Sequence, residues 1–334
     1  MKIRVLILVV FSLVLPREIN AQQMPIYTNY LFNAYAFNPA VAGSTPFVSA
    51  MMNYRDQWVG FDGAPRTFMA SMYGPFKKSK KVALGGMIST DITGLLQRTS
   101  VYFTYAYHVQ LNSKWKLGLG LSGGAMQYRV SLYNAKLYDK EDQVLNGNLL
   151  TSGVFDANAG LYLYSSKFFF GLSGYQMANN SINIPGSESN LSPQFYAMSG
   201  YTFKINKNFD LQPSCLLKYN SPVPLQPEFS LRAIYKKLFW IGGSMRMNEA
   251  FCFMLGCVCY ERFNIAYAYD FPYMGLMKYN TGSHEIMLRY NFVKTKKQIN
   301  KDEEEFNEID NSFKSNLKNK KKSPENTEQK KDEE

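Results

Sequence analysis

Polar and apolar residues alternate with a period of two along most of the chain between residues 49 and 293. Every odd position from Val101 to Leu111 is apolar or aromatic, and the same holds from Phe209 to Tyr219. A period of two is the pattern of a β-strand with one apolar face. It predicts about fourteen strands, at residues 49–55, 66–74, 82–91, 98–112, 114–129, 154–166, 167–177, 193–206, 209–220, 227–237, 239–248, 250–260, 262–271 and 283–293. Many of these segments have 10–13 residues, the length that a tilted strand needs to cross a bilayer.

The connections between these segments are short and long in turn. The short links are residues 112–114, 165–167, 206–208, 236–238 and 261–262, and the longer links are residues 94–98, 131–153, 178–192, 221–227 and 272–282. Short periplasmic turns and longer outer loops are typical of outer-membrane barrels. We therefore expect an all-β fold: a transmembrane antiparallel β-barrel of about fourteen strands over residues 49–293. Its apolar face would meet lipid, and its polar face would line the lumen.

A soluble β-sandwich or propeller is the alternative interpretation of the same alternation, with the apolar face buried in protein. The length of the segments and the alternation of the turns favour the membrane barrel. The last segment also ends in aromatic residues, Tyr290 and Phe292. Such a terminal strand resembles the signal that the barrel-insertion machinery of outer membranes recognises.

The two ends of the chain differ from this middle part. Lys2 and Arg4 precede an apolar run of 11 residues that is followed by a short polar stretch ending at Ala21. This predicts a secretory signal peptide over residues 1–21, with a retained anchor as the alternative, and hence an exported protein. Residues 294–334 contain 11 Lys and 11 acidic residues, too many charges for a buried core. Because an even number of strands puts both chain ends on one side, we expect this charged tail in the periplasm.

Four apolar residues recur at helical spacing within the tail: Phe306, Ile309, Phe313 and Leu317. The simplest interpretation is a disordered, solvated segment. The alternative hypothesis is a helix that folds on a periplasmic partner and presents this narrow stripe to it.

Residues suited to catalysis are sparse. The chain has two His and four Cys, and no nucleophile motif, phosphate-binding loop or pair of catalytic carboxylates stands out. We assign His108 and His284 to the polar faces of their strands, and Cys257 and Cys259 to an apolar face as small hydrophobic residues. Residues 22–293 carry a net charge of +9. Their Lys residues lie largely in short turns, which are more simply residues of the barrel rim, and an exported chain meets little nucleic acid. We therefore expect a non-enzymatic protein without a cofactor or metal site.

The stretch that follows the expected signal peptide carries a resemblance. It begins Gln22-Gln23-Met24-Pro25-Ile26-Tyr27-Thr28-Asn29-Tyr30-Leu31-Phe32-Asn33 and continues Asn38-Pro39-Ala40-Val41-Ala42-Gly43-Ser44, Arg55-Asp56-Gln57-Trp58-Val59-Gly60 and Gly63-Ala64-Pro65-Arg66-Thr67. These motifs resemble the opening of the PorP/SprF family, outer-membrane proteins of the type IX secretion and gliding systems of Bacteroidota. Asn29 and Val41 depart mildly from the family pattern, which has Gln and Tyr there. The resemblance is specific over residues 22–75 and rests on pattern and length from there to Phe292.

The turn-forming residues in these motifs predict a segment, residues 22–48, that turns repeatedly as it enters the barrel wall and packs in the lumen. Gln57, Trp58 and Arg66 would lie in or beside the first outer loop, where they could contact a partner, and Trp58 as a residue of the interfacial belt is the alternative. The family-motif candidates for partner contact or N-terminal packing are Asn38, Pro39, Gly43, Gln57, Trp58, Gly63, Pro65 and Thr67.

The resemblance implies a non-enzymatic barrel in the outer membrane that helps to secrete, anchor or present cell-surface proteins with a C-terminal sorting domain. The implied partners are such a surface protein, periplasmic or peptidoglycan-linked secretion components, and the lipid of the outer membrane. The alternative is an outer-membrane channel or a fatty-acid-type transporter, since a fourteen-stranded barrel has a lumen wide enough to need filling. A lumen closed by residues 22–48 would count against that alternative.

Overall fold

The computed structural model describes residues 27–76, 81–131, 149–178, 180–184, 187–221, 223–247, 249–259, 262–272 and 280–292. The described chain is almost entirely β-structure, with two short 3-10 helices, η1 (Ala34–Ala36) and η2 (Pro39–Val41). The strands are β1 (Val48–Asp56), β2 (Arg66–Pro75), β3 (Val82–Thr93), β4 (Leu96–Gln110), β5 (Lys116–Ser131), β6 (Leu149–Tyr164), β7 (Phe168–Tyr175), β8 (Ser181–Ile184), β9 (Ser187–Asn190), β10 (Gln194–Tyr201), β11 (Phe203–Lys204), β12 (Phe209–Asn220), β13 (Val223–Tyr235), β14 (Phe239–Arg246), β15 (Ala250–Cys259), β16 (Phe263–Pro272) and β17 (Ser283–Phe292).

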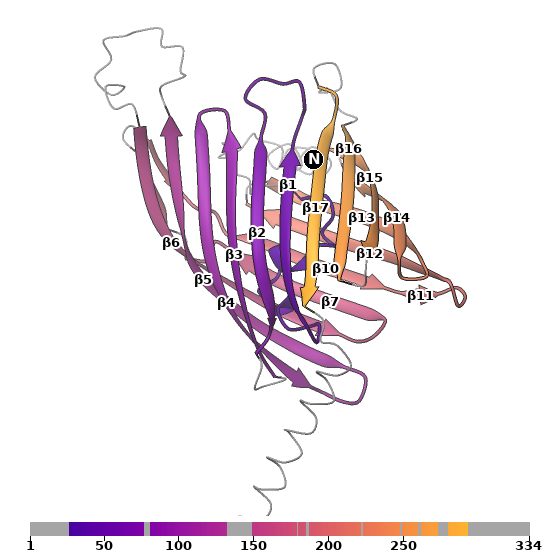
Figure 1. Ribbon diagram of the computed structural model, residues 1–334. Coiled ribbons are helices and arrows are strands. Elements are labelled where there is room, and N and C mark those ends of the chain that lie inside the picture. The colour runs from indigo at the N-terminus through magenta and orange to yellow at the C-terminus, as the bar shows by residue number, and fades with distance from the viewer. Residues whose placement is uncertain are drawn as a thin grey trace, which may run out of the picture. The chain divides into compact units, whose positions relative to one another are not determined.

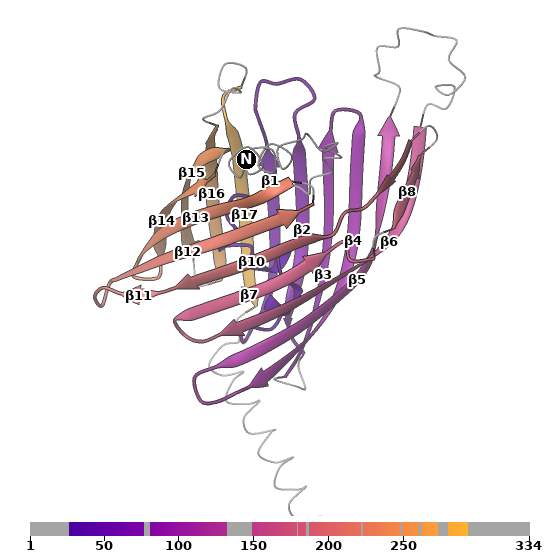
Figure 2. The ribbon, with the colours of Figure 1, turned by 180° about the vertical axis from the view of Figure 1, so that it is seen from behind.

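Fifteen of these strands form a single antiparallel sheet that closes on itself (Figures 1 and 2). β1 lies beside β17, and β10 pairs with both β7 and β12, which completes the ring. The short β11 continues β10 along β12, so the wall of the barrel has fourteen strands. β8 and β9 form a separate hairpin. The barrel predicted from the alternation is confirmed, and each of the fourteen predicted segments corresponds to one strand of the wall.

Several predicted links differ from the structure. The link predicted at residues 94–98 is a two-residue turn, because Thr93 of β3 still pairs with Leu96 of β4. The link at residues 221–227 is also tight, since β13 begins at Val223. The predicted strand at residues 193–206 is interrupted at Thr202, between β10 and β11, and the predicted loop at residues 178–192 contains the β8–β9 hairpin. Pairing with a neighbouring strand extends β3, β4 and β13 beyond the point where their alternation fades.

The wall has an apolar outer face and a mixed inner face. On β1, Met52 and Tyr54 point outward and are 56% and 44% exposed, whereas Met51, Asn53 and Arg55 point inward and are at most 2% exposed. A closed sheet with an apolar exterior satisfies every strand hydrogen bond internally, as a membrane interior demands. Along each strand, successive residues therefore face the lipid and the lumen in turn. None of the helices in the described residues has the length and apolar character needed to cross a membrane.

We call the rim where β1 begins and β17 ends the lower rim, as it appears in Figure 1, and the opposite rim the upper rim. Aromatic pairs gather at the strand ends near the lower rim: Trp115 with Phe168, Tyr201 with Phe203, Phe209 with Tyr235, and Phe263 with Tyr290, with ring centroids 4.5–6.0 Å apart. Aromatic girdles of this kind lie at the boundary between hydrocarbon and headgroups in membrane barrels. They place the lower rim at a membrane surface.

Candidate functional site: the lumen segment and its ionic anchor

The lumen of the barrel holds residues 27–43, which we call the lumen segment. None of its residues is exposed, and Tyr30, Phe32, Tyr35 and Phe37 are each at most 4% exposed. The segment packs in three apolar clusters against inward-facing residues from opposite parts of the wall, including Met198 of β10, Trp240 of β14 and Ala106 of β4. It therefore packs across the inside of the barrel, against strands on opposite sides of the wall.

The local sequence explains how this segment turns so tightly. The Asn38 side chain accepts a hydrogen bond of 2.9 Å from the Ala40 backbone N–H and caps η2, and Pro39 occupies the first helical position. Asn29 does the same for the turn before η1, since its Oδ1 accepts from the Phe32 backbone N–H at 3.1 Å. Asn caps and a Pro at the first helical position are the residues that short helical turns favour.

Asn38 also ties the lumen segment to the wall. Its Nδ2 donates to the backbone oxygens of Leu161 on β6, at 2.8 Å, and Leu172 on β7, at 3.2 Å. Ser173 of β7 donates to the backbone oxygen of Phe37. One buried amide thus satisfies backbone groups of the segment and of two wall strands together.

Further hydrogen bonds join the segment to other strands. The Tyr30 hydroxyl donates to Ser214 of β12 at 2.8 Å, and Tyr35 bonds to Thr104 of β4 at 2.7 Å. The Nε2 of His108 lies 2.6 Å from the backbone oxygen of Ala42. Burial raises the pKa of Tyr30 well above its usual range and that of Tyr35 to about 12. Both hydroxyls therefore remain protonated and available as donors.

The wall is shaped for the segment at inward-facing glycines. A Cβ added to Gly120 of β5 would overlap the backbone of Pro39 and Ala40, and a Cβ added to Gly160 of β6 would overlap the Asn38 side chain. Glycine is needed where another backbone approaches a strand this closely. The plug and the inner wall are therefore complementary surfaces.

A buried ionic cluster anchors the beginning of the lumen segment. Arg55 of β1 contacts Asp270 of β16 at 2.6 Å and Glu285 of β17 at 3.1 Å, and all three side chains are at most 3% exposed. Thr28 donates its backbone N–H to Glu285 at 2.7 Å and its hydroxyl to Asp270 at 2.8 Å. The Arg55 Nη1 donates to the Thr28 hydroxyl at 2.6 Å.

The cluster continues across the lumen through Arg246 of β14. This guanidinium lies 3.2 Å from Glu228 of β13, 2.8 Å from Glu249 and 3.5 Å from Asp270. Lys218 of β12 lies 3.5 Å from Glu228. Buried charges persist when they are paired and hydrogen-bonded, and here strands β12, β13, β14, β16, β17 and β1 and the turn after β14 supply the partners. The arrangement holds Thr28 in place.

The sequence candidates fall into separate groups. Asn38, Pro39 and Gly43 belong to the lumen segment, and the backbone of Gly43 lies against Ala83 and His108 with a φ of +85°. Gln57, Trp58, Gly63 and Pro65 lie in the β1–β2 loop at the upper rim, and Thr67 follows in β2, where it donates to Asp91 at 2.6 Å. The structure therefore does not bring the motif residues into one site.

The β1–β2 loop is an ordered part of the upper rim. Gln57 is 7% exposed, and its backbone N–H donates to the oxygen of Pro65 at 3.0 Å. The N–H of Trp58 donates to Ser283 at 3.1 Å. The oxygen of Gly63, whose φ is +72°, accepts from the N–H of Gly94 in the next turn at 2.9 Å. These bonds join the loop to both of its neighbours along the rim.

The remaining candidates have the following positions. Tyr290 packs against Phe263 at the lower rim, and Phe292 is 48% exposed at the end of β17. The tail residues Phe306, Ile309, Phe313 and Leu317, the expected signal peptide and the long link at residues 132–148 lie outside the described residues. The assignment of His284 to a polar face is wrong: it shares the outward parity of Ile286 and bonds to the hydroxyl of Tyr267 at 2.6 Å. Among the described residues, no three His, Cys, Asp or Glu side chains gather in a way that could hold a metal ion.

The anchoring residues Thr28, Asp270, Glu285, Glu228 and Arg246 were missed in the sequence. The alternation of inward-facing and outward-facing positions could have identified the four wall residues. Each of them is charged and falls on an inward-facing position of its strand. Alternation along a strand shows to which side a residue points, but it does not show which strands face one another across a lumen.

Asn38→Ala is expected to lower the free energy of unfolding by about 2–4 kcal/mol, since it leaves the oxygens of Leu161 and Leu172 and the N–H of Ala40 without this partner in a buried place. Urea titration in detergent micelles, followed by tryptophan fluorescence, measures the change. Asn206→Ala is the matched control, because Asn206 also accepts from two backbone N–H groups, those of Asn208 and Phe209, but in an exposed turn. An equal effect of the two substitutions would contradict the anchoring role of Asn38.

Comparison with solved structures finds several similar chains at low scores. The chain is similar to the CymD monoaromatic hydrocarbon channel, with a TM-score of 0.46, 13% identity and coverage of 81% of this chain and 94% of that one. A Pseudomonas aeruginosa FadL homologue gives a TM-score of 0.43, 11% identity and coverage of 81% and 95%. The KdgM porin gives 0.37, 10% identity and coverage of 73% and 99%. These scores are too low to carry an inference about this chain.

Among curated proteins, no relative of this chain was found. The family described as "Type IX secretion system membrane protein PorP/SprF", in contrast, matches residues 19–290. That range contains the lumen segment, the ionic anchor and nearly the whole wall of the barrel. The chain therefore belongs to the PorP/SprF family of type IX secretion system membrane proteins.

Proposed function

We propose that this protein is a non-enzymatic, plugged barrel of the outer membrane that helps to secrete, anchor or present surface proteins with a C-terminal sorting domain. Membership of a secretion-system membrane family supports a role in protein export. The observation that supports the proposal is the lumen segment, which packs inside the barrel against strands on opposite sides. A barrel filled in this way acts through its rims rather than through a pore.

In this proposal the lower rim faces the periplasm, because both ends of an even-stranded barrel lie on that side, and the upper rim faces outward. The β1–β2 loop supplies a contact surface there. Phe61 at its tip is 50% exposed, and Val59 pairs with Gly282 and Thr281 before β17 through backbone bonds of 2.8 and 2.9 Å, respectively. An exposed aromatic residue on an ordered loop is suited to bind a protein partner.

The alternative function, a channel or a fatty-acid-type transporter, requires a path through the lumen. The buried aromatic residues of the lumen segment and the ionic cluster occupy that path. The filled lumen therefore argues against this alternative.

The test is to extract tagged protein from native membranes in mild detergent and to identify by mass spectrometry what co-purifies. We expect a large surface protein with a sorting domain, or periplasmic components of the secretion apparatus. Phe61→Ser should reduce recovery of the surface protein, whereas Leu95→Ser should not. Leu95 is the matched control, because it is 39% exposed in the neighbouring β3–β4 turn of the same rim. A barrel that is recovered alone and conducts ions in a planar bilayer would overturn the proposal.

A further inference from the structure

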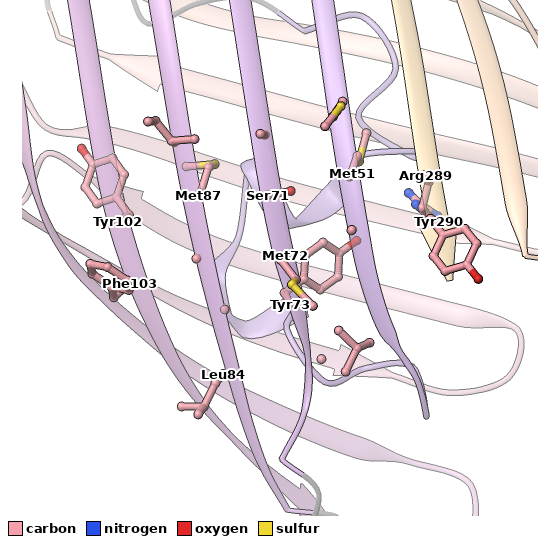
Figure 3. A pocket seen from close by; sticks show the side chains of 18 of the residues that line it. Met51, Ser71, Met72, Tyr73, Leu84, Met87, Tyr102, Phe103, Arg289 and Tyr290 are labelled. Atoms are coloured by element: carbon pink, nitrogen blue, oxygen red, sulfur yellow. The ribbon is translucent and has the colours of Figure 1, made fainter. Parts of the chain in front are cut away.

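An apolar groove lies on the outer wall where the barrel closes, over β1 to β4 and the adjoining ends of β16 and β17 (Figure 3). We call it the wall groove; it is open to the outside and has a volume of about 850 Å³. The labelled Met72, Leu84, Phe103 and Tyr290 lie around it in Figure 3. Inward-facing neighbours such as Met87 also contribute to the lining, because the wall is one sheet thick. Its volume is that of a ligand site.

Small outward-facing residues create the wall groove. Ala50, Ala70 and Gly86 lie between the larger Met72, Ile88 and Phe103, since the register pairs Ala50 with Met72, Ala70 with Ile88 and Gly86 with Phe103. A Cβ added to Gly86 would meet only the backbone oxygen of Tyr102, at 3.9 Å. Packing therefore does not demand glycine there, and the missing side chain leaves space on the lipid-facing surface.

The wall groove has the depth of one membrane leaflet. Its lining begins at the lower rim, with Val48, Pro75 and Tyr290, and ends near the middle of the strands, at Met52 and Ile88. Val48 and Met52 are four residues apart, which corresponds to about 13 Å along a strand. One leaflet contributes about 15 Å of a hydrocarbon core of about 30 Å. The groove thus lies within the hydrocarbon of the leaflet at the lower rim.

The lower rim, at which the wall groove begins, carries basic residues in all of its turns. The described residues of the six lower-rim turns include seven basic residues: Lys81, Lys114, Lys167, Lys207, Lys236, Lys237 and Arg262. Lys81 immediately precedes β3, which forms part of the groove. Basic residues at a membrane surface attract anionic headgroups. The charge of the rim therefore complements a phosphate, while the groove above it complements hydrocarbon.

We propose that the wall groove is a specific binding site for an acyl chain of an anionic phospholipid from the leaflet at the lower rim. The acyl chain lies between Met72 and Phe103, over Gly86, and the phosphate lies at the level of Lys81. This site does not depend on the role of the barrel in secretion, since it is on the opposite side of the wall from the lumen segment.

The test is native mass spectrometry of the full chain, purified in mild detergent, delipidated and then mixed with phosphatidylglycerol or with zwitterionic phosphatidylcholine. The wild-type barrel should retain one phosphatidylglycerol molecule in preference to phosphatidylcholine. Gly86→Phe places an aromatic ring in the middle of the groove and should reduce this retention about tenfold, because the acyl chain loses part of its buried contact area. Gly123→Phe is the matched control: Gly123 also faces outward, has nothing within 4 Å of an added Cβ, and lies outside the groove.

Equal retention by the Gly86→Phe and Gly123→Phe barrels would overturn the proposal, and so would equal retention of the two lipids by the wild type. Binding of a second copy of the chain that Gly86→Phe abolishes would also overturn it, because the groove would then be a protein interface. Heat-modified migration in gels shows whether each variant is still a folded barrel.

Discussion

Arg55→Met is expected to lower the free energy of unfolding of the barrel by about 3–5 kcal/mol, the usual effect of removing one partner from a buried ionic cluster. Without the guanidinium, Asp270 and Glu285 remain buried beside each other with Thr28 as their shared donor. Arg246, 3.5 Å from Asp270, compensates only part of this charge. Urea titration of the barrel in detergent micelles, followed by tryptophan fluorescence, measures the loss.

Arg66→Met is the matched control for this substitution. Arg66 also pairs with a carboxylate, that of Asp56 at 3.5 Å, but its side chain is 66% exposed. We expect it to change stability by less than about 1 kcal/mol, as exposed pairs do. Adding Asp270→Asn and Glu285→Gln to Arg55→Met should restore part of the loss, because the uncompensated charges are then gone. If Arg55→Met costs no more than Arg66→Met, the ionic cluster does not anchor the lumen segment.

Gly120→Val is expected to displace the lumen segment and to open the barrel. The new side chain would occupy the place of the Pro39 and Ala40 backbone, and neither backbone can move without breaking the hydrogen bonds of Asn38. Gly120 pairs with Ala106 of β4 and Gly160 of β6 in a regular antiparallel ladder, which the substitution leaves in place. The wall therefore persists while the plug leaves. A lumen of this size without its plug should conduct ions.

Two measurements on Gly120→Val check this expectation: single-channel conductance in a planar bilayer and protease cleavage within residues 27–43. The wild type should show neither, and the variant should show both. Gly123→Val provides the control on the same strand, because Gly123 faces outward with open space around it. Conductance from the wild type, or a variant as closed and as protected as the wild type, would contradict the role of the lumen segment as a plug.

The wall of the barrel was largely predictable from the sequence, because alternation is a local property. Each strand of the wall must present apolar residues to one side and mixed residues to the other, and this requirement is visible in the sequences of the fourteen wall strands. Strand ends were less predictable, since Thr93, Leu96 and Val223 owe their extended conformation to pairing with a neighbour. The hairpin of β8 and β9 lay within a predicted loop for the same reason.

The candidate site was predictable only in part. The turn-forming residues around Asn38 and Gly43 indicated an ordered segment near the wall, and the family resemblance pointed to the same residues. The partners of that segment could not be deduced, because Thr28 meets Glu285 across 257 positions of sequence. The wall groove likewise depends on which small residues become neighbours across four strands.

By itself, the sequence determined the class of this protein: an antiparallel membrane barrel of about fourteen strands, with an inner and an outer face assigned by parity. Only the tertiary structure showed that the lumen segment packs inside the barrel and which residues hold it in place. The physical reason is that the closing of the ring, β17 on β1 and β12 on β10, brings Arg55, Asp270 and Glu285 together around Thr28. Alternation acts between adjacent residues, whereas this cluster exists only once the barrel has closed.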